Sequence, residues 1–358
     1  KTHFLGDTMK PLILTPGFGD NAPTASLYYG QDVRRSLRLL PGASVDTVCT
    51  SPPYWGLRDY GTGDAQIGLE DTVEAYVESL VEVFGEIKRV LRPDGTVWLN
   101  LGDSYGGKVS KPGATAQAGN TLANVCTPGA ARPKSIGLKQ KDLIGIPWRV
   151  AFALQADGWY LRSDVIWAKP NPMPESVRDR PTKAHEYVFL LSQSAQYYYD
   201  ARAVMEPATY GAAHAKKATS WGTNRKHPNK ANVADYAFAG DNKTTHRGED
   251  GSYLRNKRDV WTVSTHPYKG AHFAVWPPEL IRPMILAGCP TGGVVLDPFS
   301  GSATTGMVAL QEGRNYIGVD LNADYLDLAT ARVEQRRAPQ DPEPCGGLDV
   351  FELFGGSK

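Results

Sequence analysis

One short motif combines a hydroxyl, a rigid proline pair and two aromatic rings: Ser51-Pro52-Pro53-Tyr54-Trp55. The Ser51 hydroxyl can accept a hydrogen bond, and the Pro52 carbonyl, held by the Pro-Pro geometry, can accept another. The rings of Tyr54 and Trp55 offer surfaces on which a planar group can stack. What such a motif would bind depends on what lies elsewhere in the chain. The alternative is that the Pro-Pro pair does no more than end a strand.

A second motif, DPFSGS at residues 297–302, has the composition of a ligand-binding turn. Gly301 lets a bound ligand approach the backbone closely. Asp320 follows 23 residues after Asp297, at the end of the next expected strand, where a carboxylate can accept both hydroxyls of a ribose. The G-x-G-x-x-G pattern is missing and no phosphate-clamping lysine follows, so a nucleoside without a pyrophosphate fits better than NAD. An ordinary turn between a strand and a helix is the alternative.

The elements around the first motif form a strand, helix, strand unit. A buried strand is expected at 46–50, so the motif follows its carboxyl end. Apolar residues then keep helical spacing from Asp71, which with Glu74 resembles a capping box. A second strand is expected at 96–101. This unit is the building block of a parallel sheet and indicates an α/β fold.

The rest of the chain continues this pattern around one irregular region. Pro147 begins a helix that ends before Gly158, and two strands follow at 159–169 and 185–193. Residues 201–260 show little periodicity and are typical of an inserted module. Residues 292–336 predict strand, glycine turn, helix, strand and helix.

Composition narrows the class of protein. The chain has 358 residues and 41% hydrophobic content, and no apolar run approaches the roughly 20 residues of a membrane span. The four cysteines are widely scattered, without the paired spacing of a zinc site or a disulfide framework. We therefore expect no bound metal, and we expect the protein in a reducing cytoplasm. The four are Cys49, Cys126, Cys289 and Cys345.

The net charge is only +1, but positive charge is concentrated in two segments of the chain. Residues 104–141 contain six Lys or Arg and no acid, and residues 201–270 contain twelve against six acids. Clustered Lys and Arg suit a polyanion such as nucleic acid, although solvated loops would explain them equally well.

Taken together, TSPPYW and DPFSGSATT resemble the catalytic and cofactor motifs of amino-methylating DNA methyltransferases. The catalytic motif comes first in this chain, and that permuted order resembles the beta class of the family. Residues 272–281 (HFAVWPPELI) resemble the additional motif on the methionine side of the cofactor. Ala303 departs from the family, which often has glycine there, and we expect the small side chain to be tolerated.

The resemblance implies a Rossmann-like, S-adenosylmethionine-dependent methyltransferase fold in a circularly permuted order. It divides the chain into a catalytic half at 26–200, a target-recognition region at 201–270, a cofactor-binding half at 271–337 and a tail at 338–358. The basic loop at 104–141 is expected to be a mobile arm within the catalytic half.

The resemblance also implies the activity. The base flips out of double-stranded DNA, stacks on Tyr54, and receives the methyl group directly on its exocyclic nitrogen. Serine at position 51 resembles the residue that cytosine-N4 methyltransferases carry at this position. Methylation of adenine at N6 is the alternative. The TSPPYW motif contains no Pro-Cys nucleophile of the kind that carbon-5 methylation requires, and Cys49 is expected in the core. The expected cofactor-binding residues are Asp32, His272, Pro277, Asp297, Pro298, Phe299, Ser300, Gly301, Ser302, Thr304, Asp320, Leu321 and Asn322.

The basic segments are expected to contact DNA, with phosphate contacts from the first and base readers in the second. The residues concerned are Lys108, Lys111, Arg132, Lys134, Arg225, Lys226, Arg255 and Arg258. A homodimer and a cognate restriction endonuclease are further partners that the resemblance implies, in a prokaryotic cytoplasm.

Other classes fit less well. A protein-glutamine methyltransferase carries its cofactor turn first, and a catalytically dead DNA-binding module would not need Ser51, Tyr54, Asp297 and Asp320 together. RNA as the substrate stays open. His185 and Glu186 lie on an expected strand without partner spacing, so we interpret them as structural.

Overall fold

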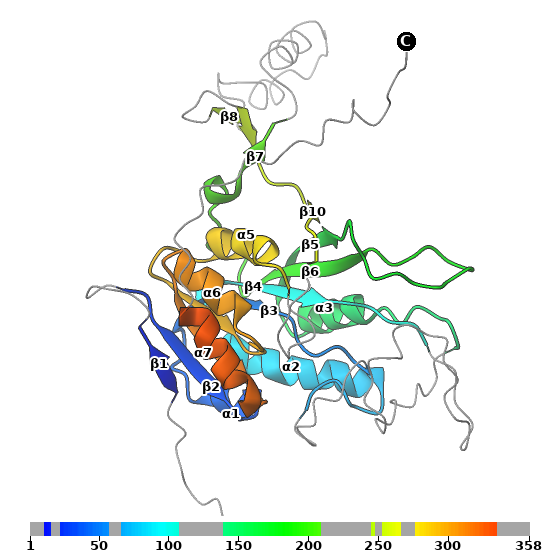
Figure 1. The fold of residues 1–358 in the computed structure, drawn as a ribbon, viewed down its shortest axis with the longest axis horizontal. Helices are drawn as coiled ribbons and strands as arrows, with labels where there is room; N and C mark the ends of the chain where they lie inside the picture. The colour runs from blue at the N-terminus through cyan, green and yellow to red at the C-terminus, as the bar shows by residue number, and fades with distance from the viewer. Residues whose placement is uncertain are drawn as a thin grey trace, which may run out of the picture.

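The computed structural model describes residues 11–15, 22–56, 66–106, 139–208, 245–247, 253–265 and 276–334. Most of these residues build one nine-stranded sheet between two layers of helices (Figure 1). None of the helices in these ranges is both long and apolar enough to cross a membrane.

The large sheet has the order β1-β2-β12-β11-β3-β4-β6-β5-β10. Its five central strands from β2 to β4 run parallel, β6 runs antiparallel to both neighbours, and β1 is antiparallel to β2. In chain order the strands are β1 (Leu12–Leu14), β2 (Ala25–Tyr29), β3 (Val45–Thr50), β4 (Leu91–Leu101), β5 (Tyr160–Ala168), β6 (His185–Ser192), β10 (Val260–Thr262), β11 (Val294–Asp297) and β12 (Asn315–Asp320).

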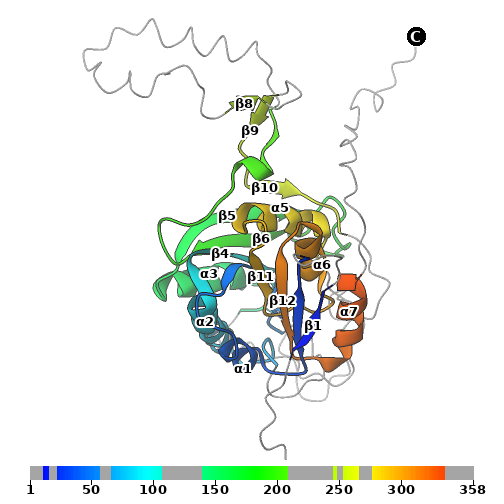
Figure 2. The same ribbon diagram turned by 90° about the vertical axis from the view of Figure 1, so that its left-hand side faces the viewer.

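Two hydrophobic cores lie on the two faces of this sheet. The first core packs under α1 (Val33–Arg38), α2 (Val73–Val90) and α3 (Ile146–Ala156). The second packs under α5 (Pro278–Gly288), α6 (Thr304–Gln311) and α7 (Leu326–Glu334). Figure 2 shows the two groups of helices on opposite sides of the strands. Along β3 the side chains alternate between the cores, with Val48 in the first and Cys49 in the second. The expected core position of Cys49 is confirmed.

Local sequence explains how the helices begin. Thr72, not Asp71, caps α2, because its hydroxyl accepts a hydrogen bond from the Ala75 amide at 3.1 Å. The predicted capping box was therefore wrong by one residue, since Thr72 has the extended backbone that a cap requires. Pro147 lies in the first turn of α3, and Gly158 follows its end with a positive φ of 92°, both as predicted.

The connections around the centre of the sheet place the site. β3 leads through α2 to β4 on one side, whereas β11 leads through α6 to β12 on the other. β3 and β11 are nonetheless neighbours, with Thr47 opposite Val295. A crevice opens outside the carboxyl ends of parallel strands where the strand order reverses in this way, and ligands bind there. The two sequence motifs follow these two strands.

A separate small sheet stands away from the large one (Figure 1). It has the order β7-β9-β8, formed by β7 (Glu206–Pro207), β9 (Tyr253–Arg255) and β8 (Thr245–Arg247). The short helices η3 (Arg202–Val204) and η4 (Ala323–Tyr325) complete the described elements. The expected inserted region at 201–270 thus supplies this small sheet, and it also supplies β10 at the edge of the large one.

Candidate active site

Asp297 joins the two motifs at the junction of β3 and β11. Its carboxylate accepts hydrogen bonds from the Thr50 hydroxyl at 2.8 Å and the Thr305 hydroxyl at 2.7 Å. The Phe299 amide donates a further bond at 3.1 Å. Only 2% of Asp297 is exposed, and this burial raises the pKa of its carboxyl to about 6. Asp297 therefore fixes the glycine turn to the end of β3, the strand that leads into Ser51.

Buried hydroxyls shape the glycine turn itself. The Ser300 hydroxyl lies 2.7 Å from both the Tyr29 and the Tyr316 hydroxyls, and Tyr29 also donates to the Gly301 carbonyl at 2.8 Å. Gly301 has a positive φ of 50°, which a residue without a side chain adopts without strain. The turn is consequently held from β2 and from β12 at once.

Ala303, the departure from the family pattern, is the N-cap of α6. It is fully buried and has a φ of 56°, in the left-handed region where glycine is the preferred residue. This backbone conformation explains why glycine suits the position, and it costs alanine of the order of 1 kcal/mol. Ser302 and Thr304 beside it are buried, and the Ser302 hydroxyl accepts a bond from Arg332 at 3.1 Å.

Asp320 lies at the end of β12 beside the turn. Its carboxylate accepts hydrogen bonds from the backbone amides of Gly301 at 2.7 Å and Asn322 at 2.9 Å. Burial raises the pKa of Asp320 to about 6. At the end of the neighbouring strand β2, the Gly30 amide donates to the Asp320 carbonyl at 3.0 Å. The next residue, Gln31, has a buried Oε1 without a hydrogen-bond partner. Carboxylate lone pairs and an orphaned amide oxygen at one sheet edge fit a ligand rich in hydroxyl and amino donors.

Ser51 and Tyr54 meet at a buried amide on β4. The Ser51 hydroxyl donates to Asn100 Oδ1 at 3.2 Å, and the Tyr54 hydroxyl lies 3.1 Å from the same atom. The Asn100 side-chain NH₂ donates to the Tyr187 carbonyl at 3.0 Å, which sets the orientation of the amide. Asn100 is 1% exposed. The catalytic motif is therefore hydrogen-bonded to the rigid centre of the sheet.

The Tyr54 ring is fixed from two further directions. Its hydroxyl lies 2.8 Å from Glu186 Oε2, and Glu186 forms an ion pair with Lys169. The ring packs so closely on Gly102 that a Cβ added there would lie 2.5 Å from Tyr54 Cε2. Burial and the neighbouring Glu186 carboxylate raise the pKa of Tyr54 well above its usual value, so the hydroxyl remains a donor.

The other members of the catalytic motif differ in their surroundings. The Pro53 carbonyl accepts a hydrogen bond from the Tyr76 hydroxyl at 2.9 Å, which ties this part of the motif to the core. Trp55 is 5% exposed and its ring nitrogen donates to the Glu70 carbonyl at 2.9 Å. Since the Trp55 ring is part of the core, Tyr54 is the better placed of the two stacking candidates.

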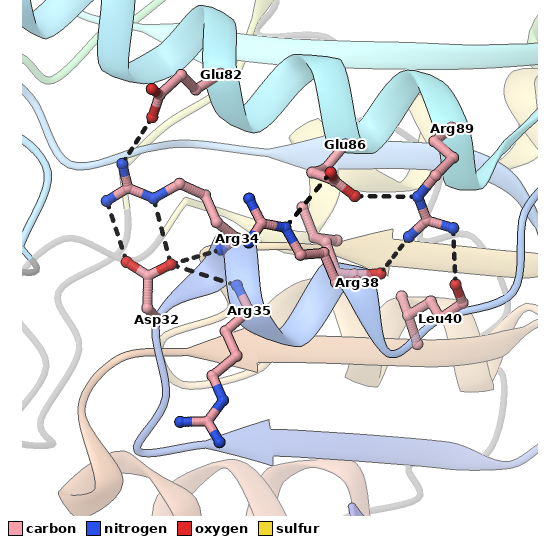
Figure 3. Close-up of polar contacts among 9 residues, drawn as sticks. Asp32, Arg34, Arg35, Arg38, Leu40, Glu82, Glu86 and Arg89 are labelled. Atoms are coloured by element: carbon pink, nitrogen blue, oxygen red, sulfur yellow. Dashed lines mark hydrogen bonds and ion pairs between the residues drawn. The ribbon is translucent and has the colours of Figure 1, made fainter.

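Asp32 follows β2 and caps α1 (Figure 3). Its carboxylate accepts bonds from the Arg34 amide at 2.8 Å and from the Arg34 guanidinium, which also reaches Glu82 on α2 at 2.9 Å. Glu86 on α2 completes this α1–α2 network with Arg38 and Arg89. The cap accounts for Asp32 without a ligand, and its expected contact with the cofactor stays a prediction.

The remaining expected residues divide into four groups. Pro298 is buried, Phe299 packs on the first core, and Leu321 and Asn322 follow Asp320, all beside the turn. Pro277 precedes α5, whose last residue, Gly288, packs against the side chains of Thr47 on β3 and Thr96 on β4. Arg255 and Arg258 both pair with Glu206 of the small sheet, away from the turn. The positions outside the described residues are His272, Lys108, Lys111, Arg132, Lys134, Arg225 and Lys226.

The sequence analysis missed Asn100, Lys169 and Gly102, and it found no partner for Glu186. A single amide within the apolar run TVWLNL was a usable signal, because a buried polar group in a strand requires partners. Nothing in the sequence connects Glu186 with Tyr54, since their contact depends on the pairing of β4 with β6. Within the described ranges, no group of three or more His, Cys, Asp or Glu side chains could hold a metal ion.

A largely parallel sheet with antiparallel strands β1 and β6, an acid bonded to the glycine turn and a hydroxyl at the end of the neighbouring strand together define a Rossmann-like methyltransferase fold. The chain belongs to the N6/N4 family of DNA methylases, whose family model matches residues 45–331.

Similar proteins agree with this assignment. The chain is 46% identical over 311 residues to the type II methyltransferase M.Cfr9I of Citrobacter freundii, covering 87% of this chain and 88% of that protein. It is 44% identical over 308 residues to the type II methyltransferase M.SmaI of Serratia marcescens, covering 86% and 90%. These findings confirm the predicted family.

Solved structures share the fold. The PvuII DNA methyltransferase, described as cytosine-N4-specific, matches with a TM-score of 0.55 at 18% identity over 87% of each chain. The DNA modification methylase TTHA0409 of Thermus thermophilus, in complex with S-adenosyl-L-methionine, matches with a TM-score of 0.50 at 23% identity, covering 86% of this chain and 92% of that one. The predicted S-adenosylmethionine-dependent methyltransferase fold is confirmed.

Proposed function

We propose that this DNA methyltransferase transfers a methyl group from S-adenosylmethionine to the exocyclic N4 of cytosine in double-stranded DNA. The observation that carries this proposal is the position of Ser51, which lies one residue after the Thr50 that is bonded to Asp297 of the glycine turn. A target amine held at Ser51 would therefore lie beside the methyl donor. The bound cofactor supplies an activated methyl group on a sulfonium.

The hydrogen bond from Ser51 to Asn100 decides what Ser51 can do. Because the hydroxyl hydrogen points to Asn100, the lone pairs of Ser51 Oγ are left to accept a hydrogen bond from the target amine. The Pro52 carbonyl can accept from the second N–H, and the lone pair of the nitrogen then turns toward the methyl group. Positioning and polarisation of this kind can supply most of the catalysis without a covalent intermediate.

The choice of cytosine rests on serine at the first motif position, a short side chain that cannot carry a charge. The adenine enzymes of this class more often carry an acid or an amide at this position. A flipped base would stack on the Tyr54 ring. The hydroxyl of this ring is bonded to Glu186, and the ring packs on Gly102. N6-methylation of adenine is the alternative.

The residues at the carboxyl ends of β11 and β12 would hold the cofactor. Asp320 can accept the ribose hydroxyls, and Gly301 allows the nucleoside to approach the backbone. The orphaned Gln31 Oε1 is an available acceptor for an amino group of the same ligand. Asp297 acts chiefly by holding the turn, since its oxygens already accept bonds from Thr50 and Thr305.

The pH dependence of cofactor binding should follow Asp320. Its pKa of about 6 in the free protein is above the ordinary value because of burial, and the ionised form is the one that accepts ribose hydroxyls. Protonation therefore competes with binding, so affinity should fall as the pH drops through 6, by up to about tenfold per pH unit for one proton. Calorimetric titration of S-adenosylmethionine between about pH 8 and pH 5 measures this. Affinity that is constant across this range would contradict the role of Asp320, and Asp320→Asn should flatten the profile.

Substitution of Gly102 tests the position of the Tyr54 ring. A Cβ at this residue would lie 2.5 Å from Tyr54 Cε2, so Gly102→Ala should push the ring from its place and lower kcat by about tenfold. Methyl transfer to DNA under saturating cofactor is the measurement. Gly85→Ala on α2 is the matched control, because a Cβ there meets nothing within 4 Å. Equal rates for both variants would show that the ring position does not matter.

Target recognition is assigned to residues 201–270 and phosphate contact to the basic loop at 104–141. Arg255 Nε and Arg258 Nε both bond to Glu206 Oε1, at 3.0 and 2.8 Å. A guanidinium held through Nε can still present its terminal nitrogens to a guanine edge or a phosphate. The type II names of the relatives support a place in a restriction-modification system with a cognate endonuclease. A homodimer belongs to the same proposal.

The modified base can be identified directly. DNA from cells that express the protein is digested to nucleosides and analysed by mass spectrometry, alongside DNA from cells that express Ser51→Ala. We expect N4-methyldeoxycytidine only with the unchanged protein. N6-methyldeoxyadenosine would overturn the assignment of the base and leave the family unchanged. Single-molecule sequencing of the same DNA would give the recognition site.

A further inference from the structure

Lys169 and Glu186 form a partly buried ion pair behind the catalytic tyrosine. Both side chains are 17% exposed, and their charged atoms are in direct contact. Lys169 follows β5 and Glu186 lies on β6, so neither belongs to a motif that the proposed chemistry uses. A pair that has lost most of its water is costly unless its geometry is good and its other atoms are satisfied. Its other contacts therefore indicate its role.

The other oxygen of Glu186 points to the active site. Glu186 Oε2 lies 2.8 Å from the Tyr54 hydroxyl, while Oε1 faces Lys169. One carboxylate thus uses its two oxygens for two different partners, the cation on one side and the catalytic ring on the other. Hydrogen bonds to an ionised acceptor are about twice as strong as neutral ones.

Lys169 is itself fixed to the body of the sheet. Its ammonium lies 4.1 Å from the centroid of the Trp167 ring, and its backbone amide donates to the Ala184 carbonyl at 2.8 Å. The Trp167 ring nitrogen donates to the Val263 carbonyl at 2.8 Å. The contacts therefore run without a break from β5, through Lys169 and Glu186, to the Tyr54 hydroxyl.

We infer that Glu186, with Lys169 as its counter-ion, is a positioning residue for methyl transfer that holds the Tyr54 ring in place to stack the flipped base. This inference rests on the proposed function. An aromatic side chain can rotate about two bonds, and the Tyr54 ring packs on Gly102 and against the first core. The hydroxyl bond removes that freedom before the base arrives, so less ordering is needed during flipping.

A double-mutant cycle between Tyr54 and Glu186 tests the inference. Tyr54→Phe keeps the stacking surface and removes the hydroxyl, whereas Glu186→Ala removes its acceptor. Each single variant should lower kcat by on the order of tenfold, and the double variant should be no slower than the slower single one. The Michaelis constant for S-adenosylmethionine should not change. Glu186→Gln keeps an acceptor and should recover most of the rate.

A second readout separates positioning from general stability. DNA with 2-aminopurine at the target base reports flipping by fluorescence, and its signal should fall in Tyr54→Phe and Glu186→Ala alike. Glu175→Ala is the matched control. Glu175 lies between β5 and β6 and forms a similarly buried ion pair with Arg180, at 15% and 22% exposure, and this pair does not include Tyr54. Should Glu186→Ala unfold at the assay temperature, the cycle is run with Glu186→Leu and Lys169→Met together, which removes both charges.

The outcomes distinguish this inference from the proposed function. The positioning role would be overturned if the loss of kcat in the double variant equalled the product of the two single losses. It would also be overturned if Glu186→Gln were as slow as Glu186→Ala. In either case the unchanged enzyme would still methylate DNA. An unchanged protein that transfers no methyl group to DNA would overturn both.

Discussion

Ser51→Ala should lower the rate of methyl transfer to DNA by about 10²-fold or more, by analogy with the loss of one preorganised polar contact at a reacting group. The hydroxyl donates to Asn100 and so presents its lone pairs to the target amine. Without it, the amine keeps one N–H unpaired and its lone pair stays delocalised into the base. Transfer of tritium from labelled S-adenosylmethionine to DNA is the assay, with single-turnover rates to isolate the chemical step.

Two comparisons make this result specific. Cofactor affinity should be unchanged in Ser51→Ala, because Ser51 makes none of the contacts described above that shape the glycine turn. Ser44→Ala is the control, since this partly exposed serine precedes β3 and its hydroxyl bonds to the Pro41 carbonyl at 2.8 Å, away from the site. A rate for Ser51→Ala within a few-fold of the unchanged enzyme would remove Ser51 from the mechanism.

Asp320→Ala should weaken binding of S-adenosylmethionine by about 10- to 100-fold, because hydrogen bonds to a charged group contribute roughly 1.5–3 kcal/mol. The carboxylate also accepts bonds from the Gly301 and Asn322 amides, so its removal loosens the turn as well as the ribose contact. Isothermal titration calorimetry on the free protein gives the affinity without dependence on DNA.

Asp320→Asn separates the two effects. The asparagine keeps an oxygen for one backbone amide and loses the charge, so it should bind the cofactor better than Asp320→Ala and less well than the unchanged protein. Asp324→Ala, at an exposed residue of η4, is the control on the same loop. Affinity that survives in Asp320→Ala would place the ribose elsewhere.

The sequence predicted those parts of the site that follow from a single segment. The strand before Ser51, the turn before α6 and the acid after β12 lie where periodicity and glycine placement indicated. The two motifs are more than 240 residues apart in the chain, yet the family resemblance anticipated that they form one site, and the hydrogen bond from Thr50 to Asp297 joins them.

Features that depend on several segments could not be predicted in this way. Glu186 looked structural because its partners Tyr54 and Lys169 come from other segments, and only the strand order brings them together. Trp55 was a reasonable stacking candidate by residue type. Its burial depends on how α2 and the segment that precedes it, with Glu70, pack on the ring, and residue type does not reveal this packing. The N-cap of α2 fell on Thr72 because backbone angles select among adjacent candidates.

The strand order has a consequence for synthesis on the ribosome. β11 and β12 lie at the middle of the large sheet, between β2 and β3, although they are the last strands to be made. Until residue 320 has emerged, β2 and β3 each expose an unpaired edge, and such edges invite association with other chains. Closure then requires contacts between residues about 250 apart in the chain, such as Thr50 with Asp297, and non-local pairing of this kind slows folding. The nascent protein therefore depends on protection of a half-built sheet for most of its translation.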